Sequence, residues 1–381
     1  MERIYKKMLF NLSLCSFAKN AYLGYQPYFL SSGNVKMNRI HFSKSFSSFF
    51  VGSGIQIHNG QFSFLLSTGV IISSISHYRK QFISYSSFSL ENENTFSDCI
   101  FKEISTNSGN TAGILISNYV NVLIQRCGFY KLFINAATSN GAALYTNLCS
   151  KLVIKESCFD YCWASHGASY GIHTDHYEIP TVEIRNSIET RVGWAGSQGH
   201  SSYCGGRTSF LFDNNNGSHI ISSGNAGVFY FLKTEINGLG VKYCHACNSK
   251  VTSLIFTWTG NDMKLDHFVF ENCSVSSWFR IESNRISMYT CCFFKISPKT
   301  SLVNQNSQCL SFNECIFSDA ENVLSFGSAS RTLCIFSQIS IPNPINSVNN
   351  KNCWALGELS TKSFRVFANS LNLYVLMLIF Q

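Results

Sequence analysis

The sequence predicts an all-β protein, a right-handed parallel β-helix of about nine or ten coils with irregular caps. Three observations lead to this prediction. The composition favours strands over helices, a short phrase recurs along most of the chain, and each recurrence contains apolar and polar residues that alternate with a period of two. Together they indicate one elongated repetitive domain rather than several compact ones.

The composition is that of a folded, strand-rich chain. Hydrophobic residues make up 45% of the 381 residues, whereas charged residues make up only 13%, about half the usual share. A disordered chain would have fewer apolar residues and more net charge. Ser, Asn, Gly, Phe and Cys replace the helix formers Ala, Glu and Lys, and this favours strands and turns.

The repeated phrase consists of an apolar residue, a small residue three positions later and a phenylalanine two positions after that. Ile154, Ser157 and Phe159 illustrate it. The gap between Ser187 and Cys244 is twice as long as its neighbours, which predicts a degenerate unit at residues 209–219. The small position is occupied by Cys99, Cys127, Ser157, Ser187, Cys244, Cys291, Cys315 and Cys334, and one further unit has Phe268 there.

The length of the unit selects the architecture. Most units are 23 to 30 residues long and contain two or three runs of alternating residues separated by Gly, Asn and Ser. No amphipathic helix of useful length lies between these runs, which argues against βαβ units and leucine-rich repeats. Three short strands and three turns fill one coil of a parallel β-helix, and equivalent residues then stack about 4.8 Å apart.

This stacking explains the cysteines and phenylalanines. Inward phenylalanines of successive coils would form a column of packed rings. A tight bend would admit only a small apolar group, and the Cys side chain is such a group. We therefore interpret the cysteines of the small position as a buried column rather than as redox or metal sites. The C-x-x-C pair Cys244 and Cys247 is a weak metal candidate, since no second pair accompanies it, and we expect no cofactor.

Several phrases resemble those of known repeat families. The units are similar to those of right-handed parallel β-helices of the pectate-lyase-like superfamily. More narrowly they resemble the polymorphic outer-membrane-protein type and the surface repeats of parasitic protists, whose units carry Gly-Gly-Ala-Ile and Phe-x-x-Asn. The matching stretches are GAAL at Gly141–Leu144, FDNN at Phe212–Asn215 and FENC at Phe270–Cys273, although no intact Gly-Gly-Ala-Ile occurs.

The resemblance implies a test for enzymatic activity, because enzymes of that superfamily use clustered carboxylates to bind calcium or to act as acid and base. Only 21 residues are acidic, and the position before the small residue holds no carboxylate column: it is occupied by Asp98, Arg126, Glu156, Asn186, Tyr243, His267 and Thr290. The densest polar stretch, residues 164–178, offers His173, Asp175 and His176 as weak catalytic candidates. Structural or solvent-exposed histidines are the alternative interpretation.

The charge and the termini bear on partners and location. The net charge of +8 arises from scattered basic residues, so we expect no nucleic-acid partner; glycans or a host or cell-surface ligand fit better. The first 18 residues resemble a secretory signal, with a first strand or cap as the alternative. Residues 1–85 are expected to form a cap or degenerate coils, residues 86–340 the β-helix, and residues 341–381 a cap. The apolar end of this cap has about half the length of a membrane-spanning helix, and a dimer-forming segment or the start of a membrane span are the alternatives to a cap. Membrane association through either terminus stays open.

Three functional hypotheses follow. The first is a non-enzymatic binding or adhesion solenoid that is secreted or displayed on the cell surface, with an unknown ligand. The second is a carbohydrate-active β-helix enzyme, a polysaccharide lyase or hydrolase, with a diverged site near residues 166–178. The third is a degenerate member of an expanded family with little function of its own.

Overall fold

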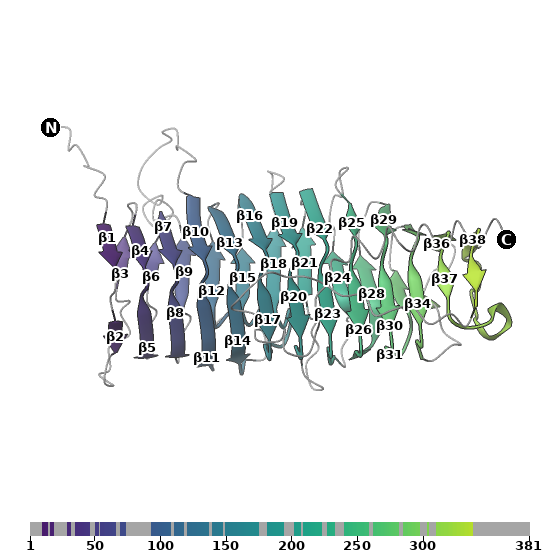
Figure 1. Ribbon diagram of the computed structural model, residues 1–381, viewed down its shortest axis with the longest axis horizontal. Helices are drawn as coiled ribbons and strands as arrows, with labels where there is room; N and C mark the ends of the chain where they lie inside the picture. The colour runs from purple at the N-terminus through teal and green to yellow at the C-terminus, as the bar shows by residue number, and fades with distance from the viewer. Residues whose placement is uncertain are drawn as a thin grey trace.

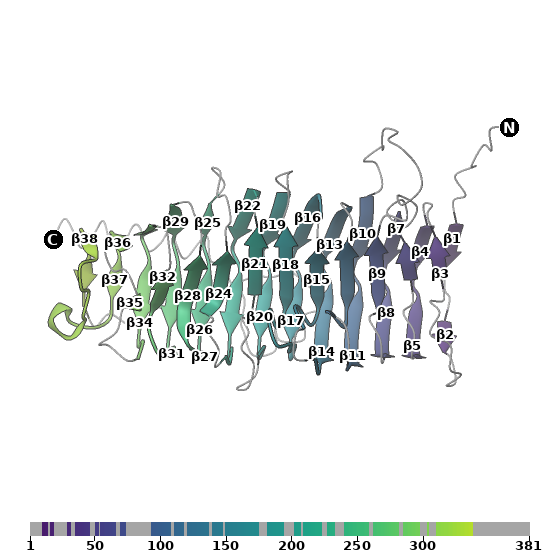
Figure 2. The same ribbon diagram turned by 180° about the vertical axis from the view of Figure 1, so that it is seen from behind.

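The chain folds into a parallel β-solenoid in which three long sheets run side by side along one axis (Figures 1 and 2). The computed structural model describes residues 10–13, 16–18, 29–31, 35–45, 50–52, 54–65, 69–73, 93–107, 110–117, 120–136, 139–147, 149–174, 181–193, 202–206, 209–222, 227–232, 240–258, 262–281, 285–297, 303–304 and 310–337. Successive strands enter sheets A, B and C in turn up to β35, and the last two coils contribute described strands to sheets A and B alone. The predicted all-β parallel solenoid is therefore confirmed.

Each sheet is parallel throughout its described pairings. Sheet A consists of β1 (Phe10–Ser13), β4 (Val35–Asn38), β7 (Ile55–His58), β10 (Glu93–Ser97), β13 (Asn121–Gln125), β16 (Lys151–Lys155), β19 (Thr181–Arg185), β22 (Ser209–Asp213), β25 (Val241–Lys242), β29 (Met263–Asp266), β33 (Ile286–Tyr289), β36 (Leu310–Asn313) and β38 (Ser330–Thr332). Sheet B consists of β2 (Ser16–Ala18), β5 (His41–Ser45), β8 (Gln61–Leu65), β11 (Ile100–Thr106), β14 (Gly128–Ile134), β17 (Cys158–Asp160), β20 (Ile188–Thr190), β23 (Asn216–Ser218), β26 (His245–Cys247), β30 (Val269–Glu271), β34 (Cys292–Phe294), β37 (Ile316–Phe317) and β39 (Ile335–Phe336).

Sheet C and two small elements complete the described structure. Sheet C consists of β3 (Phe29–Ser31), β6 (Phe50–Gly52), β9 (Val70–Ser73), β12 (Ile114–Ser117), β15 (Leu144–Asn147), β18 (Tyr170–Thr174), β21 (Ser202–Gly206), β24 (Gly227–Leu232), β28 (Ser253–Trp258), β32 (Phe279–Ile281) and β35 (Val303–Asn304). β27 (Lys250–Val251) pairs with β31 (Ser274–Val275) outside the three sheets, and a single 3-10 turn, η2 (Glu321–Val323), precedes β38.

The expected number of nine or ten coils is wrong, because sheets A and B hold 13 strands each. Three coils precede residue 93, and the register shows why the cysteine pattern missed them. Phe42 and Phe62 align with Phe101, so Ile40 and Gly60 occupy the position that Cys99 fills in the next coil. The degenerate unit expected at residues 209–219 is present as β22 and β23, with Asn215 in the small position.

A column of stacked phenylalanine rings fills the core beneath sheet B. The ring centroids of Phe101 and Phe129 are 5.0 Å apart, and so are those of Phe129 and Phe159. A second stack runs from Phe270 to Phe336 with spacings of 5.0 to 5.4 Å. Nearly parallel rings at this spacing add to the free energy of burying each side chain, which explains why the phrase repeats a phenylalanine.

Three coils between the two stacks lack the phenylalanine. Glu189, Gly217 and Ala246 take its place in register on β20, β23 and β26. At Gly217 a Cβ atom would lie 2.8 Å from Ile220 and 2.9 Å from Val228, so those side chains already occupy the space of a ring. The core is continuous through these coils, but different side chains fill it.

Removing one ring should test the stack. Phe129→Ala should lower the free energy of unfolding by about 3–5 kcal/mol, because it leaves a cavity between two rings. Tyr130→Ala is the matched control, since Tyr130 is the next residue on β14 and is partly exposed, and it should cost less than about 1 kcal/mol. Urea denaturation of both variants would measure the difference, and equal losses would contradict the stacking interpretation.

Candidate functional site

From β4 onward, each coil turns from sheet A to sheet B at a single residue with left-handed backbone conformation. We call this row of residues the A–B corner: Arg39, Asn59, Asp98, Arg126, Glu156, Asn186, Asn214, Tyr243, His267, Thr290, Glu314 and Leu333, all with φ between 48° and 57°. Such φ values are uncommon for residues other than Gly. The bend changes the direction of the strand within one residue and points the next side chain into the interior.

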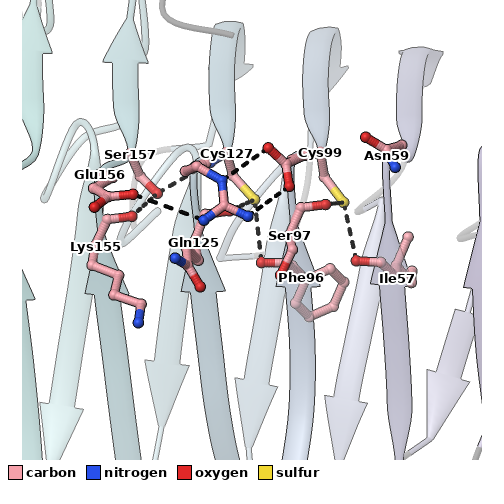
Figure 3. A network of polar contacts seen from close by, with 12 residues as sticks. Ile57, Asn59, Phe96, Ser97, Cys99, Gln125, Cys127, Lys155, Glu156 and Ser157 are labelled. Carbon is pink, nitrogen blue, oxygen red and sulfur yellow. Dashed lines mark hydrogen bonds and ion pairs between the residues drawn. The ribbon is translucent and has the colours of Figure 1, made fainter. Parts of the chain in front are cut away.

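The residue after the corner is the small residue of the repeated phrase, and it does more than fill space. The thiol of Cys99 donates to the carbonyl oxygens of Ser97 and Ile57, at 3.3 and 3.5 Å. Cys127 repeats the arrangement one coil later with Gln125 and Phe96 (Figure 3). The small position therefore favours a small side chain that can also donate a hydrogen bond to the backbone carbonyls at the bend.

Serine and asparagine meet the same requirement where cysteine is absent. Ser157 Oγ donates to the carbonyl of Lys155 at 3.1 Å and accepts from the backbone N–H of Cys127 at 3.3 Å. Ser187 Oγ accepts from the N–H of Ser157 at 3.3 Å, and Asn215 Oδ1 accepts from the N–H of Ser187 at 3.0 Å. From Cys127 to Asn215 the small column is thus a hydrogen-bonded row, a refinement of the purely apolar column that the sequence predicted.

In the eight coils from β11 to β34, a second bend with the same construction lies three residues after the start of the sheet B strand. We call this row the B corner; its left-handed residues are Glu103, Lys131, Tyr161, Arg191, His219, Asn248, Asn272 and Lys295. The following residue again points inward, and Cys162, Ser249 and Cys273 donate to the carbonyls of Asp160, Cys247 and Glu271. Two corners per coil therefore account for most of the described cysteines.

Four of the buried thiols, Cys99, Cys149, Cys244 and Cys273, are held in the protonated form by their burial. Burial raises the pKa of Cys149 and of Cys273 to about 11 in each case, and it raises the pKa of Cys99 and Cys244 well above the ordinary value. The thiolate is the form that attacks electrophiles and binds metals. These cysteines therefore act as structural donors rather than as nucleophiles.

The A–B corner carries a row of ionic contacts on its outer side. Arg126 makes two hydrogen bonds to the carboxylate of Asp98, at 2.8 and 3.0 Å, and lies 3.9 Å from Glu156 in the next coil. Farther along, Asn214 Nδ2 donates to Asn186 Oδ1 at 2.6 Å. The sequence had treated this position as a failed carboxylate column, and the structure shows charges of alternating sign over three of its coils, at Asp98, Arg126 and Glu156.

The outer face of sheet B carries buried polar contacts. Arg191 donates to both carboxylate oxygens of Asp160, at 2.7 and 2.9 Å, and its guanidinium lies 4.9 Å from the ring centre of Tyr161. One coil later Ser218 and Thr190 share a hydrogen bond of 2.9 Å. These contacts were missed because the strand has only three residues, too few for alternation to assign its faces.

Farther along the same face, His245 Nε2 lies 3.7 Å from the carboxylate of Glu271. His245 is only 7% exposed, and contact with it lowers the pKa of Glu271 below its ordinary value. This contact joins strands β26 and β30 on the outside of the solenoid. No sequence motif marks it, since the two residues belong to different coils.

The sequence-predicted candidates do not form one described cluster. His173 lies on β18 of sheet C, where its ring packs edge-on against Tyr145 at 5.8 Å, while Asp175 and His176 lie outside the described residues. Cys244 precedes β26 and faces the interior, where its thiol donates to the carbonyl of Lys242. Cys247, three residues later, faces outward beside Glu271, so the two thiols point to opposite faces.

No cluster of three or more His, Cys, Asp or Glu side chains within the described ranges is arranged to hold a metal ion. Among those same residues, no helix is long and apolar enough to cross a membrane. The expectation of no catalytic residues stays a prediction, because part of the 164–178 stretch lies outside the description.

Comparison with known proteins returned no match: no family, curated protein or solved structure is similar to this chain. Its assignment therefore rests on the fold and on the side chains described above.

Glu189 is the one acidic side chain that takes a position of the phenylalanine column. It is 3% exposed, and Oε2 has no hydrogen-bond partner. Burial raises the pKa of Glu189 to about 7, partly offset by the hydroxyls of Ser169 and Tyr170. A carboxyl group in this environment is held protonated below neutral pH.

The pH dependence of stability should report this group. Between about pH 4.5 and 7 the unfolded chain releases the proton while the folded chain keeps it, so stability should fall as pH rises through this window, by about 3 kcal/mol in total. Glu189→Gln cannot ionise and should remove this slope. Urea denaturation of the wild-type protein and the variant from pH 4 to 8 would measure the slope. The same dependence of stability on pH in both proteins would contradict a buried carboxyl group at Glu189.

The small column yields a second test at Ser187. Ser187→Cys should change stability by less than about 1 kcal/mol, because both side chains are small donors. Ser187→Ala should cost about 1–2 kcal/mol, since it leaves the buried N–H of Ser157 without its acceptor. Chemical denaturation midpoints compare the two. If the alanine variant is as stable as the cysteine variant, the size of the side chain alone decides which residues the small position accepts.

Proposed function

We propose that this protein is a non-enzymatic binding or adhesion solenoid of the pectate-lyase-like superfamily, secreted or displayed on the cell surface. The observation that carries the proposal is the regular outer row of the A–B corner. Asp98, Arg126 and Glu156 occupy consecutive coils, about 4.8 Å apart as strand spacing requires. A regular polymer such as a glycan can contact several coils at once, and many weak contacts then add up to firm binding.

The state of Cys158 supports the proposed location. Cys158 is disulfide-bonded, and stable disulfides are typical of secreted and surface proteins rather than cytosolic ones. Labelling of intact cells that express a tagged protein would test this. A purely cytosolic distribution would contradict the proposal.

Binding is tested with purified protein on an array of neutral and acidic glycans and on intact cells. An Arg126→Ala, Glu156→Ala variant should bind severalfold more weakly, because it removes two consecutive members of the row. Lys131→Ala, Glu103→Ala is the matched control, since it removes an ion pair of 3.8 Å between consecutive coils at the B corner. Equal binding by both variants would remove the A–B corner as the contact surface.

The enzyme hypothesis is tested with the same protein. Incubation with pectin-like and uronate polymers should release no product. Turnover that disappears in an Asp175→Ala, His176→Ala double variant would contradict the binding proposal and favour an enzyme with a site near residues 166–178.

A further inference from the structure

The chain contains three Asn-x-Ser triplets, which begin at Asn11, Asn216 and Asn272. This triplet is the acceptor sequence for an N-linked oligosaccharide in secreted proteins, and so bulky a group requires a surface position. Because such short triplets also arise by chance, the placement of each one in the fold decides whether a coil can carry a glycan there. The side chain of Asn11 lies outside the described part of the structure, and the other two triplets can be compared directly.

Asn216 lies in a buried part of the fold. It is the first residue of β23, where it stands in register between Ile188 and His245, and it is only 8% exposed. The hydroxyl group of the same triplet, on Ser218, is buried as well and shares a hydrogen bond of 2.9 Å with Thr190. A sugar attached to Asn216 would displace these packed neighbours, so this triplet is incompatible with a glycan in the folded coil.

Asn272 is placed on the outside of the solenoid. It belongs to the B corner, with a φ of 49°, and it is exposed. Ser274, which supplies the hydroxyl group of the triplet, is also exposed and stands in register with Lys250 at the start of β31. Between them Cys273 is buried, and its thiol donates to the carbonyl of Glu271 at 3.3 Å. The bend therefore presents the asparagine and the serine to solvent and buries only the middle residue of the triplet.

The neighbours of Asn272 are compatible with a glycan. The B-corner residues of the coils before and after it, Asn248 and Lys295, are both polar and exposed. The one hydrogen bond of the Asn272 side chain runs along this row, from Nδ2 to Asn248 Oδ1 at 2.7 Å. A side-chain amide has two N–H hydrogens, and a glycan replaces one of them, so the nitrogen keeps a donor for this contact.

We propose that Asn272 is the acceptor site for an N-linked oligosaccharide, an inference that rests on the secreted or surface location proposed above. In the transfer, Nδ2 of Asn272 loses one proton and forms a bond to C1 of the first sugar of a lipid-linked oligosaccharide. The bond between C1 and the pyrophosphate oxygen breaks, and the lipid pyrophosphate leaves with the electron pair of that bond.

The place of this glycan in the coil bears on ligand binding. The A–B corner residue of the same coil is His267, at the other end of the sheet B strand β30. The five residues from His267 to Asn272 correspond to about 16 Å of extended chain. A glycan on the B corner therefore leaves the A–B corner open to an external ligand.

Glycosylation is measured on the full-length protein, directed into the secretory pathway of eukaryotic cells by an added cleavable signal. Tryptic peptides are treated with peptide N-glycosidase in heavy-oxygen water, which converts a glycosylated asparagine into labelled aspartate. In secreted protein, peptide 265–280, with Asn272, should carry the label, and peptide 208–233, with Asn216, should not. An unlabelled peptide 265–280 in secreted and cell-retained protein alike would overturn the proposal, and a labelled peptide 208–233 in secreted protein would contradict its structural basis.

Variants of the B corner test whether the exposed bend makes Asn272 an acceptor. Asn272→Gln should abolish the decrease in electrophoretic mobility that the glycosidase reverses. Asn248→Gln is the matched control, because Asn248 is the equivalent exposed asparagine of the preceding coil and begins no triplet, and it should keep the decrease. A Lys250→Thr, Asn272→Gln variant has a triplet at Asn248 instead and should regain one glycan. If it gains none, exposure at the B corner does not explain the acceptor site.

The location is tested separately, with the tagged chain that has no added signal. A cytosolic distribution of that chain, together with a labelled Asn272 in the signal-directed protein, would contradict the proposed location and support the acceptor site. An unmodified Asn272 in the signal-directed protein would overturn the acceptor site wherever the chain without the added signal is found.

Discussion

Parallel hydrogen bonding between successive coils is the constraint on which the rest of this structure depends. Each strand can pair with its successor only if equivalent residues lie directly above one another, and so every side chain meets its own counterpart one coil away. Side chains of the same kind must therefore pack against one another. This arrangement is favourable for aromatic rings such as Phe101 and Phe129 and for hydrogen-bonding groups that act as donor and acceptor in turn. It does not suit charges, unless their sign alternates as it does at Asp98, Arg126 and Glu156.

The two corners show how this constraint shapes the local chemistry. A left-handed residue turns the strand within one position and leaves nearby carbonyls in need of donors. Cys, Ser and Asn at the next position supply them from within the small space available, as Cys99, Ser157 and Asn215 do. The abundance of cysteine is thus a consequence of geometry. The same burial that makes these thiols useful as donors raises their pKa and keeps them unreactive.

The fold could be predicted from the sequence because its signal is repeated many times. One Cys-x-Phe phrase means little, but its recurrence in register assigned the strands, the inward rings and even the degenerate coil around Asn215. The first coils were left out of the predicted coil count because Ile40 and Gly60 stand where the repeated phrase has Cys or Ser. The contacts on the outer face of sheet B could not be predicted from the sequence for a different reason. The partners in each contact are about 25 to 30 residues apart and become neighbours only when the coils stack, as for Asp160 with Arg191 and His245 with Glu271.

The sequence by itself determined that this chain is a parallel solenoid, because period, alternation and residue size are local properties that every coil repeats. Only the tertiary structure decided which side each residue of the three-residue sheet B strands faces, and therefore that Cys244 and Cys247 point apart. It also decided that Glu189 replaces a buried ring and titrates near neutrality. These features depend on contacts between coils, and the free energy of such contacts is set by the neighbours above and below rather than by the adjoining residues in the chain.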